Sequence, residues 1–536
     1  MSRIVQAILI VAILFFGILI GYRLSKDPSD AVFGQQKKLL DALGMISALY
    51  VDKVEDEGLV DAGIEGMAES LDPHTLYLKA DQVSFSNSEF QGNFEGIGIE
   101  FDIVHDTLLV VTPLAGGPSE SAGILAGDRI LEIDTLSAVG ISPMEVIERL
   151  RGKKGTSVGL KIYRPYTSKI IDVDVVRDKI PTFSVDAVFM LDEKTGYIRL
   201  SRFVATTATE FRGAMAKLHQ QGMHSIIVDV RGNPGGYLDQ AVEVADEFLP
   251  DGKLIVYTKS RNGGQDEMRY NATRQGDFEE MNVVLLVDRG SASAAEILAG
   301  ALQDNGRAVV VGELTFGKGL VQRQFEFDDG SAMRLTIARY FTPSGRRIQR
   351  DYSKGSQGRE EYYREVSDSH EAEKLFKDSG SLVVKSDIDG VSVFRPSKEL
   401  FAASGGILPD FWIVERSVDD FYTGLRSQGV FDEVALSIID DPSSSARSYA
   451  DGDPDAFIEN FSEDARIESS LRRICRTRSI DLDEAVFQAE RPGIIIAVKS
   501  RIARQLFGIE AQIRVLAGES DKVLRFARDL LRREAA

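Results

Sequence analysis

Two short segments of this 536-residue chain place a serine and a lysine where they could do chemistry together. The first is Asp288-Arg-Gly-Ser-Ala-Ser-Ala-Ala-Glu-Ile297, with Ser293 at the point where an expected strand turns into a helix. The second is Thr315-Phe-Gly-Lys-Gly-Leu-Val-Gln322, in which Lys318 stands between two glycines. A serine needs a base before it attacks a carbonyl, and a lysine whose pKa is lowered can supply one. The pair therefore favours an acyl-transfer enzyme over a scaffold.

Each of these residues also has an ordinary structural interpretation when it is taken alone. Ser291 or Ser293 can simply cap the helix that follows, and a loop lysine is usually solvated. Burial of Lys318 would favour the neutral amine, which is the form able to accept the serine proton. Gln322 could hold that amine by a hydrogen bond, and Asp304, at the end of the serine helix, is a second candidate for support or for structure.

A third motif could stabilise the negative charge that such an attack creates. Arg231-Gly-Asn-Pro-Gly-Gly236 follows an apolar strand expected over residues 225–230. Its last two glycines, Gly235 and Gly236, expose backbone N–H groups, as an oxyanion hole requires. The N–H of Ala294, in the first turn of the serine helix, is a further candidate donor because helix starts leave N–H groups unpaired. An ordinary glycine turn explains the motif equally well.

The elements that position these motifs follow from hydrophobic periodicity, which predicts a multidomain chain with α+β and α/β parts. Strands alternate with helices through an α/β core over residues 181–350 and 405–414. A β-rich unit over 92–166 precedes that core. One helical region, over 31–80, precedes these two units, and another, over 415–536, follows them. Residues 351–404 are polar and interrupt the core, so we expect an insertion or a mobile excursion of unknown role. The core elements are expected as strands at 196–200, 225–230, 283–287, 308–311 and 333–340, and helices at 205–221, 240–248 and 293–303.

The first 25 residues form a separate segment. The run from Ile4 to Gly21 is almost entirely apolar and is near the minimum length for a membrane-spanning helix. It is followed by a poor cleavage site, which favours an uncleaved anchor over a signal peptide. Positive residues lie on both sides of the run, at Arg3, Arg23 and Lys26, so charge does not decide its orientation.

Composition limits the partners of the chain. The formal net charge is -20, and a surface that acidic repels phosphate backbones, so we expect no nucleic-acid partner. The single cysteine, Cys475, cannot form an internal disulfide. The five histidines match no metal-binding spacing, so we expect no metal and no cofactor.

Together the three motifs resemble the C-terminal processing (tail-specific) serine peptidase family. The resemblance covers roughly residues 31 to 414 and extends to Leu71-Asp-Pro-His-Thr75, Tyr340-Phe-Thr-Pro-Ser-Gly-Arg346 and Ile407-Leu-Pro-Asp410. It implies a Ser/Lys endopeptidase in which Ser293 is the nucleophile, Lys318 is its general base and Gln322 positions the lysine. The implied oxyanion hole comes from the N–H groups of Ala294 and of Gly235 or Gly236.

The β-rich unit resembles the PDZ domain that these peptidases carry. The loop formed by Gly96, Ile97, Gly98 and Ile99 matches the carboxylate-binding loop, and Ala122-Gly-Ile-Leu-Ala-Gly-Asp-Arg-Ile130 matches its most recognisable signature. A PDZ domain adds a peptide as an extra strand and holds its C-terminal carboxylate on backbone N–H groups. The implied partners are therefore protein or peptide substrates with accessible C-termini.

The resemblance and the apolar segment together predict a single-pass protein of the inner (cytoplasmic) membrane, with its peptidase facing the periplasm or the cell exterior. A homo-oligomer or an activating partner is compatible with the sequence. Two other interpretations stay open: a PDZ adaptor on an inactive peptidase scaffold, and a different acyl-transfer enzyme on a related α/β scaffold.

Overall fold

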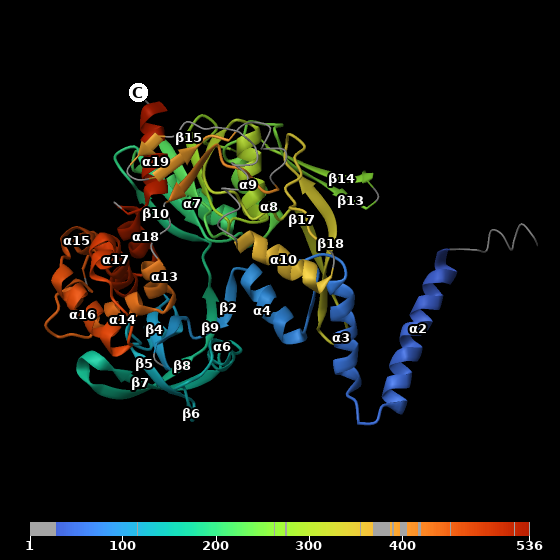
Figure 1. Cartoon of the computed structure of the whole chain (residues 1–536), viewed down its shortest axis with the longest axis horizontal. Helices are drawn as coiled ribbons and strands as arrows, with labels where there is room; N and C mark the ends of the chain where they lie inside the picture. Colours follow the sequence, from blue (N-terminus) through green and yellow to red (C-terminus); the bar gives the residue numbers. More distant parts are fainter. Residues whose placement is uncertain are drawn as a thin grey trace, which may run out of the picture.

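The structure, a computed structural model, describes residues 28–534 except 105, 115, 262, 274–275, 354, 368–385, 389–390, 397–404, 416–419, 451 and 519. The predicted membrane anchor over residues 1–25 lies outside the described residues. Within the described ranges, no helix combines the length and the apolar composition that crossing a bilayer requires. Figure 1 shows an α/β domain at the top, a small β domain below it, a helical C-terminal region beside both, and an N-terminal helix that projects outward.

An eight-stranded sheet forms the centre of the α/β domain, in the order β10-β11-β12-β15-β16-β21-β20-β19. The neighbours from β11 to β21 pair in parallel. Parallel strands that are covered on both faces are apolar throughout, as Val283-Val-Leu-Leu-Val287 is. Alternate residues of this strand enter different cores: Leu285 packs with helices α7, α8 and α9, and Leu286 packs against α18 and α19. The strands are β10 (Val185–Met190), β11 (Thr195–Leu200), β12 (Ser225–Asp229), β15 (Asn282–Val287), β16 (Ala308–Gly312), β19 (Ser386–Ile388), β20 (Val391–Phe394) and β21 (Phe411–Glu415), and the helices named here are α7 (Thr207–Gln220), α8 (Leu238–Asp246), α9 (Ala294–Asp304), α18 (Ile509–Ala517) and α19 (Lys522–Glu534).

A second sheet of five strands carries the segment that follows Lys318. Its order is β1-β18-β13-β14, with β17 paired to β18. Lys318 lies just before β17, in the loop that leaves β16 of the first sheet. This loop therefore joins the two sheets and returns the lysine to the end of the parallel sheet, where β15 leads into α9. The strands are β1 (Leu76–Leu78), β13 (Leu254–Ser260), β14 (Gly263–Asn271), β17 (Leu320–Glu326) and β18 (Ala332–Phe341).

The small β domain has its own apolar core, formed by its sheet and helix α6. Its strand order is β3-β4-β5-β7-β8, so β3 lies at an edge of the sheet. The antiparallel pair of β2 and β9 connects this domain to the α/β domain. Its elements are β2 (Asn93–Gly96), β3 (Ile99–Val104), β4 (Thr107–Pro113), α5 (Pro118–Ser121), β5 (Arg129–Ile133), β6 (Leu136–Ser137), α6 (Pro143–Leu150), β7 (Ser157–Arg164), η1 (Pro165–Thr167), β8 (Lys169–Val176) and β9 (Asp178–Pro181).

The C-terminal region is helical, as the sequence predicts, and has a separate apolar core. It touches both other domains. Arg129 of the small β domain pairs with Asp440 at 2.5 Å, and Arg231 of the α/β domain pairs with Asp521 at 2.7 Å. The remaining helices of this region are α13 (Asp420–Ser427), α14 (Val430–Ile439), η2 (Ala446–Tyr449), α15 (Pro454–Asn460), α16 (Asp464–Thr477) and α17 (Glu484–Phe507).

The helical region expected over residues 31–80 begins with two helices, which are separated by residues 50–55. These are α2 (Pro28–Leu49), which projects from the body, and α3 (Asp56–Glu69), and both are followed by α4 (Ala80–Phe90) beside the α/β domain (Figure 1). Several large apolar side chains of α2 are exposed, among them Leu39, Leu40 and Leu49.

The expected polar excursion over residues 351–404 is partly ordered. Its helix α10 (Ser356–Ser367) packs on the α/β domain, with the Tyr362 side chain 1% exposed. The Arg359 guanidinium donates to the main-chain oxygens of Asp72 and Thr75 at 3.1 and 2.7 Å. Helix α10 is therefore a packed element within this polar segment. The buried face of this helix was not recognised in the sequence, because it consists of aromatic and arginine side chains and not of aliphatic ones.

Candidate active site

Ser293 stands at the N-cap position of α9, directly after the loop that leaves β15. Its backbone has φ 53° and ψ −112°, in a region that residues other than glycine seldom adopt. Neighbouring contacts hold the loop in place: the Ser291 hydroxyl donates to the Val230 carbonyl at 2.8 Å, and the Ala292 N–H donates to the Asn233 carbonyl at 2.9 Å. Strain of this kind persists only where the surroundings fix it, and it is frequent at catalytic residues.

Glu296, one turn into α9, joins the serine to the lysine loop. Its carboxylate is fully buried and accepts four hydrogen bonds. One oxygen accepts from the N–H groups of Ser293 and Lys318, each at 2.8 Å. The other accepts from the Thr315 hydroxyl at 2.6 Å and from the Gly317 N–H at 2.7 Å. Burial raises the pKa of the Glu296 carboxyl, and these four donors oppose that rise.

Lys318 has the electrostatic surroundings that a general base needs. Burial is the main cause that lowers the pKa of its amine below the ordinary lysine value, and the charge of Arg334 lowers the pKa further. The carboxylates of Glu296 and Asp72 act in the opposite direction. A lysine with a lowered pKa carries a larger neutral fraction near neutral pH, and the neutral amine can accept a proton.

The glycine loop after β12 lies against the serine. A methyl group placed on Gly235 would lie 2.6 Å from Ser293 Cβ and 2.9 Å from Ala294 N, so only glycine fits there. The Gly235 N–H is already used, because it donates to Asn233 Oδ1 at 2.8 Å. In the described part of the chain, the N–H groups of Gly236 and Ala294 donate to no acceptor. Of the two glycines named from the sequence, Gly236 is thus the one whose N–H is free for an oxyanion.

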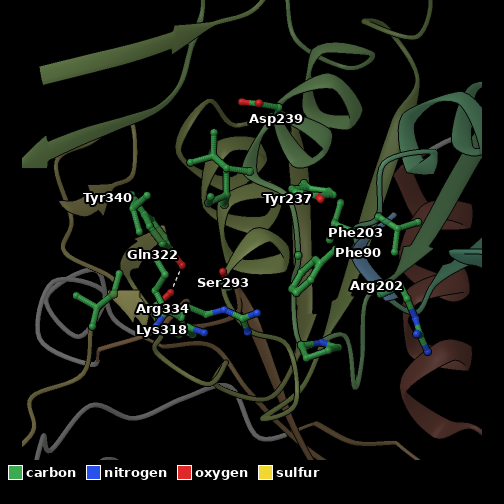
Figure 2. Close-up of a pocket in the computed structure, with 18 of the residues that line it drawn as sticks. Phe90, Arg202, Phe203, Tyr237, Asp239, Ser293, Lys318, Gln322, Arg334 and Tyr340 are labelled. Atoms are coloured by element: carbon green, nitrogen blue, oxygen red, sulfur yellow. Dashed lines mark hydrogen bonds between the residues drawn. The ribbon is translucent and has the colours of Figure 1, made fainter. Parts of the chain in front are cut away.

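The structure brings Ser293, Lys318, Gln322 and the two glycines into one cavity of about 910 Å³. Figure 2 shows Ser293 at its centre, with Lys318 and Arg334 below it and Tyr340 to one side. The Tyr340 hydroxyl donates to the Lys318 carbonyl, and burial, together with the Glu296 charge, holds the pKa of the Tyr340 phenol well above its usual value. Tyr340 therefore stays neutral and fixes the main chain of the lysine.

Two of the supporting residues named from the sequence make other contacts. The Gln322 amide nitrogen donates to the His74 carbonyl, and among the described residues Gln322 makes no hydrogen bond to Lys318. Asp304 lies at the far end of α9, where it pairs with Arg346 at 2.5 Å. Of the two roles considered for Asp304, support of the lysine or structure, these contacts favour structure, because the whole length of α9 separates Asp304 from Ser293.

Other residues of the site were missed in the sequence. Glu296 had a signal, because Ser-x-x-Glu is the spacing of a capping box, whereas Tyr340 and Arg334 come from a distant strand. His74, expected in a packing or surface role, is buried against Tyr362, with 3.4 Å from His74 Nε2 to the Tyr362 hydroxyl. Burial and the charge of Lys318 lower the pKa of His74 to about 3, so its ring is neutral at neutral pH.

Helix α10 supports the lysine loop from the side opposite the cavity. The Tyr362 hydroxyl donates to the Gly317 carbonyl at 3.2 Å and accepts from the Gln349 amide at 3.4 Å. Gln349 in turn accepts from the Gly319 N–H at 2.9 Å. The peptide groups on both sides of Lys318 are therefore held by side chains.

The predicted peptide-binding loop of the small β domain lies between β2 and β3. Gly96 ends β2, Ile99 begins β3, and Gly98 has a φ of 74°, which glycine adopts without strain. The Ile97 carbonyl accepts from the Ser119 N–H at 3.0 Å, so the loop is tied to α5. The edge strand β3 follows directly from this loop.

Parts of this chain are similar to known protein families and to named relatives. Residues 194–355 match the model of peptidase family S41, residues 109–164 match a PDZ domain, and residues 421–508 match a family of unknown function, DUF8443. The chain is 37% identical over 327 residues to the carboxy-terminal processing protease CtpA of Bacillus subtilis, covering 61% of this chain and 68% of that protein. It is 38% identical over 364 residues to the carboxyl-terminal-processing protease of Picosynechococcus, covering 63% and 84% respectively.

A solved structure titled photosystem II D1 C-terminal processing protease is 29% identical, covers 59% of this chain and 91% of that one, and superposes with a TM-score of 0.34.

Proposed function

Because this chain belongs to the carboxy-terminal processing proteases of peptidase family S41, we propose that Ser293 is its nucleophile and Lys318 its general base. The protein is a serine protease that carries a PDZ domain. The observation that carries the assignment is the buried Glu296 carboxylate, which accepts from the main-chain N–H groups of both residues at 2.8 Å. The main chains of the two residues therefore share one buried anchor, which limits how far the residues can move apart.

The proposed reaction is acyl transfer to the serine. The Ser293 oxygen bonds to the scissile carbonyl carbon while its proton passes to the neutral Lys318 amine. The N–H groups of Gly236 and Ala294 donate to the oxyanion that forms. Collapse of this intermediate breaks the C–N bond, and Lys318 returns the proton to the leaving amine. A water molecule then attacks the acyl-enzyme and gives a proton to Lys318. The bond between the carbonyl carbon and the Ser293 oxygen breaks, Lys318 returns the proton to that oxygen, and the acid is released.

Ser293→Ala and Lys318→Met variants test the two roles. Each is expected to lose hydrolysis of an unfolded protein such as casein, whereas Lys259→Met, at a partly exposed lysine paired with Glu267, keeps it. Labelling by a fluorophosphonate is expected in the wild type and absent in Ser293→Ala. Wild-type rates in either of the first two variants would show that the assignment is wrong. Absence of labelling and turnover in the wild type would favour the adaptor, and hydrolysis of a thioester without peptide cleavage would favour another acyl-transfer enzyme.

The PDZ domain is proposed to bind the C-terminal tails of substrates. Support comes from the position of β3 at the edge of its sheet, where a peptide can add as a strand, and from the loop of Gly96, Ile97, Gly98 and Ile99 beside it. A peptide with a free C-terminus is expected to bind the full-length Ser293→Ala variant in a fluorescence-polarisation assay. Binding that is unchanged when the C-terminus is amidated would contradict recognition of the tail.

We further propose a single-pass anchor in residues 1–25, with the peptidase outside the cytoplasmic membrane. The support is the apolar run from Ile4 to Gly21. Membrane fractions that retain the protein after carbonate washing, and digestion of the protein by protease added to spheroplasts, are the expected results. Release of the protein by carbonate, or protection from the added protease, would contradict the anchor and the orientation respectively. A homo-oligomer or an activating partner stays a proposal that sedimentation of the detergent-solubilised chain can test.

A further inference from the structure

Arg334 lies in the active-site cavity and exchanges no proton in the proposed reaction, although its charge lowers the pKa of Lys318. It belongs to β18, where it is paired with Leu76 of β1 and with Gln324 of β17. Its side chain lines the same cavity as Ser293 and Lys318. Figure 2 shows the guanidinium projecting into the space below Ser293.

The contacts of the Arg334 guanidinium are all with neutral groups. Its Nη2 donates to the Ser86 hydroxyl at 2.7 Å and to Gln324 Oε1 at 3.1 Å. Its central carbon lies 5.5 Å from the centre of the Phe90 ring. In the described part of the chain, Nε and Nη1 make no hydrogen bond, and no carboxylate pairs with Arg334.

A partly buried guanidinium normally faces a carboxylate, because burial of an unpaired charge is costly. Arg231, in the neighbouring glycine motif, follows this rule and pairs with Asp229 at 2.6 Å and Asp521 at 2.7 Å. For Arg334, burial lowers the pKa and no neighbouring carboxylate offsets it. The chain as a whole is strongly acidic, with a formal charge of -20, so the missing counter-charge is not explained by a shortage of carboxylates.

We propose that Arg334 binds a carboxylate of the substrate close to the scissile peptide bond. The unused donors are on Nε and Nη1, which lie on opposite edges of the guanidinium, and the charge has no anionic partner among the described residues, so both features favour an anionic acceptor such as a carboxylate oxygen. The carboxylate comes from an Asp or Glu side chain or from the C-terminus of the substrate itself. Arg334 would then set the cleavage position within the tail that the enzyme engages. This inference rests on the assignment of the Ser293 site.

A peptide library with free C-termini, and the same library with amidated C-termini, tests the inference and its two sources. Full-length wild type, Arg334→Gln, Arg334→Lys and Ser293→Ala digest both libraries, and mass spectrometry identifies the cleaved bonds. Around the bonds cut by the wild type, we expect either Asp and Glu to be enriched over Asn and Gln, or cleavage near the C-terminus to depend on the free carboxylate. A charged hydrogen-bonded pair accounts for a preference of about tenfold or more.

The preference is expected to disappear in Arg334→Gln and to persist in part in Arg334→Lys, which keeps the charge. Arg202→Gln is the matched control, because Arg202 is an exposed arginine that lines the same cavity. Ser86→Ala is a second control that removes one partner of Arg334 and keeps the charge. A ratio between two kinds of cleaved bond is unaffected by changes in the common chemical step.

Two results would overturn the inference alone: wild-type cleavage without either preference, or a preference that Arg334→Gln retains while Ser293→Ala cuts nothing. Absence of any Ser293-dependent cleavage by the wild type would instead refute the assignment of the active site, and the inference with it.

Discussion

Replacement of Glu296 by glutamine tests whether the buried carboxylate is the junction of the active site. The side chain is fully buried, and its two oxygens accept from four donors. One oxygen serves the N–H groups of Ser293 and Lys318, and the other serves Thr315 and Gly317. An amide has nearly the same shape but only one accepting oxygen, so its NH₂ group must face one of these two pairs of donors.

The expected loss follows from that count of donors. Two of the four donors lose their acceptor, and each buried unsatisfied donor costs about 1–3 kcal/mol. The active arrangement is therefore destabilised by about 2–6 kcal/mol relative to arrangements that move the serine or the lysine loop. Even the lower figure corresponds to about a 30-fold decrease in the population of competent enzyme. We expect kcat of Glu296→Gln to fall by at least that factor.

Steady-state hydrolysis of a fluorogenic peptide measures this loss, and thermal unfolding shows whether the variant is folded. The matched control is Glu313→Gln, which alters a partly exposed glutamate paired with Arg289 at 2.9 Å. Its kcat should stay within about twofold of the wild type, because exposed ion pairs contribute little. A Glu296→Gln enzyme with a kcat within about threefold of the wild type would refute the role of this carboxylate as the shared anchor.

Three other perturbations test separate parts of the site. Lys318 can accept a proton only when it is neutral, so kcat/KM should decrease as the pH falls through the pKa of its amine. Arg334→Met removes a charge that lowers this pKa, so the acidic limb of the pH profile of kcat/KM should move to higher pH. Gly236→Ala should reduce kcat by about 100-fold or more, because the added methyl group would lie 1.9 Å from the Phe203 carbonyl oxygen and would displace the oxyanion donor. The control is Gly232→Ala in the same loop, where the methyl group meets open space; its left-handed φ should cost only about 1 kcal/mol of stability. Tyr362→Phe should reduce kcat by about two- to tenfold with an unchanged KM, because it removes one hydrogen bond to the lysine loop and no contact with substrate, and a change in KM alone would contradict this.

The elements of the fold were largely predictable because their periodicities are strong and local. The strands expected at 196–200 and 308–311 are present, each within one residue of those bounds, as β11 and β16. The apolar strands at 225–230 and 283–287 are adjacent in the sheet, as an alternation of strands and helices indicates. Helix α10 was not predictable, because its buried face consists of Tyr362 and of charged or polar neighbours that bond to main-chain groups of residues 72–75.

The motifs of the site could be predicted from the sequence, but the hydrogen bonds between their residues could not. The motifs identified Ser293 and Lys318 as candidate catalytic residues. The hydrogen bond considered from Gln322 to the lysine is absent among the described residues, and the Gln322 amide donates to the His74 carbonyl instead. A choice among acceptors that lie within reach depends on distances of a few tenths of an ångström between segments some 250 residues apart. Periodicity and spacing carry no information at that scale.

The charge state of Lys318 depends on the balance between burial, one neighbouring cation and two neighbouring carboxylates. Burial and Arg334 favour the neutral amine, and the carboxylates of Glu296 and Asp72 favour the charged one. Asp72 already accepts from the N–H groups of His74 and Thr75, each at 2.9 Å, and Glu296 accepts from four donors, so part of the charge of each is satisfied elsewhere. Arg334, by contrast, has no carboxylate partner among the described residues, so no bound carboxylate weakens its effect on the amine. Burial and Arg334 thus lower the pKa of Lys318 and enlarge the neutral fraction that can accept the serine proton. A substrate carboxylate bound at Arg334 would reduce that effect and make the amine a stronger base at the moment when the proton must be taken.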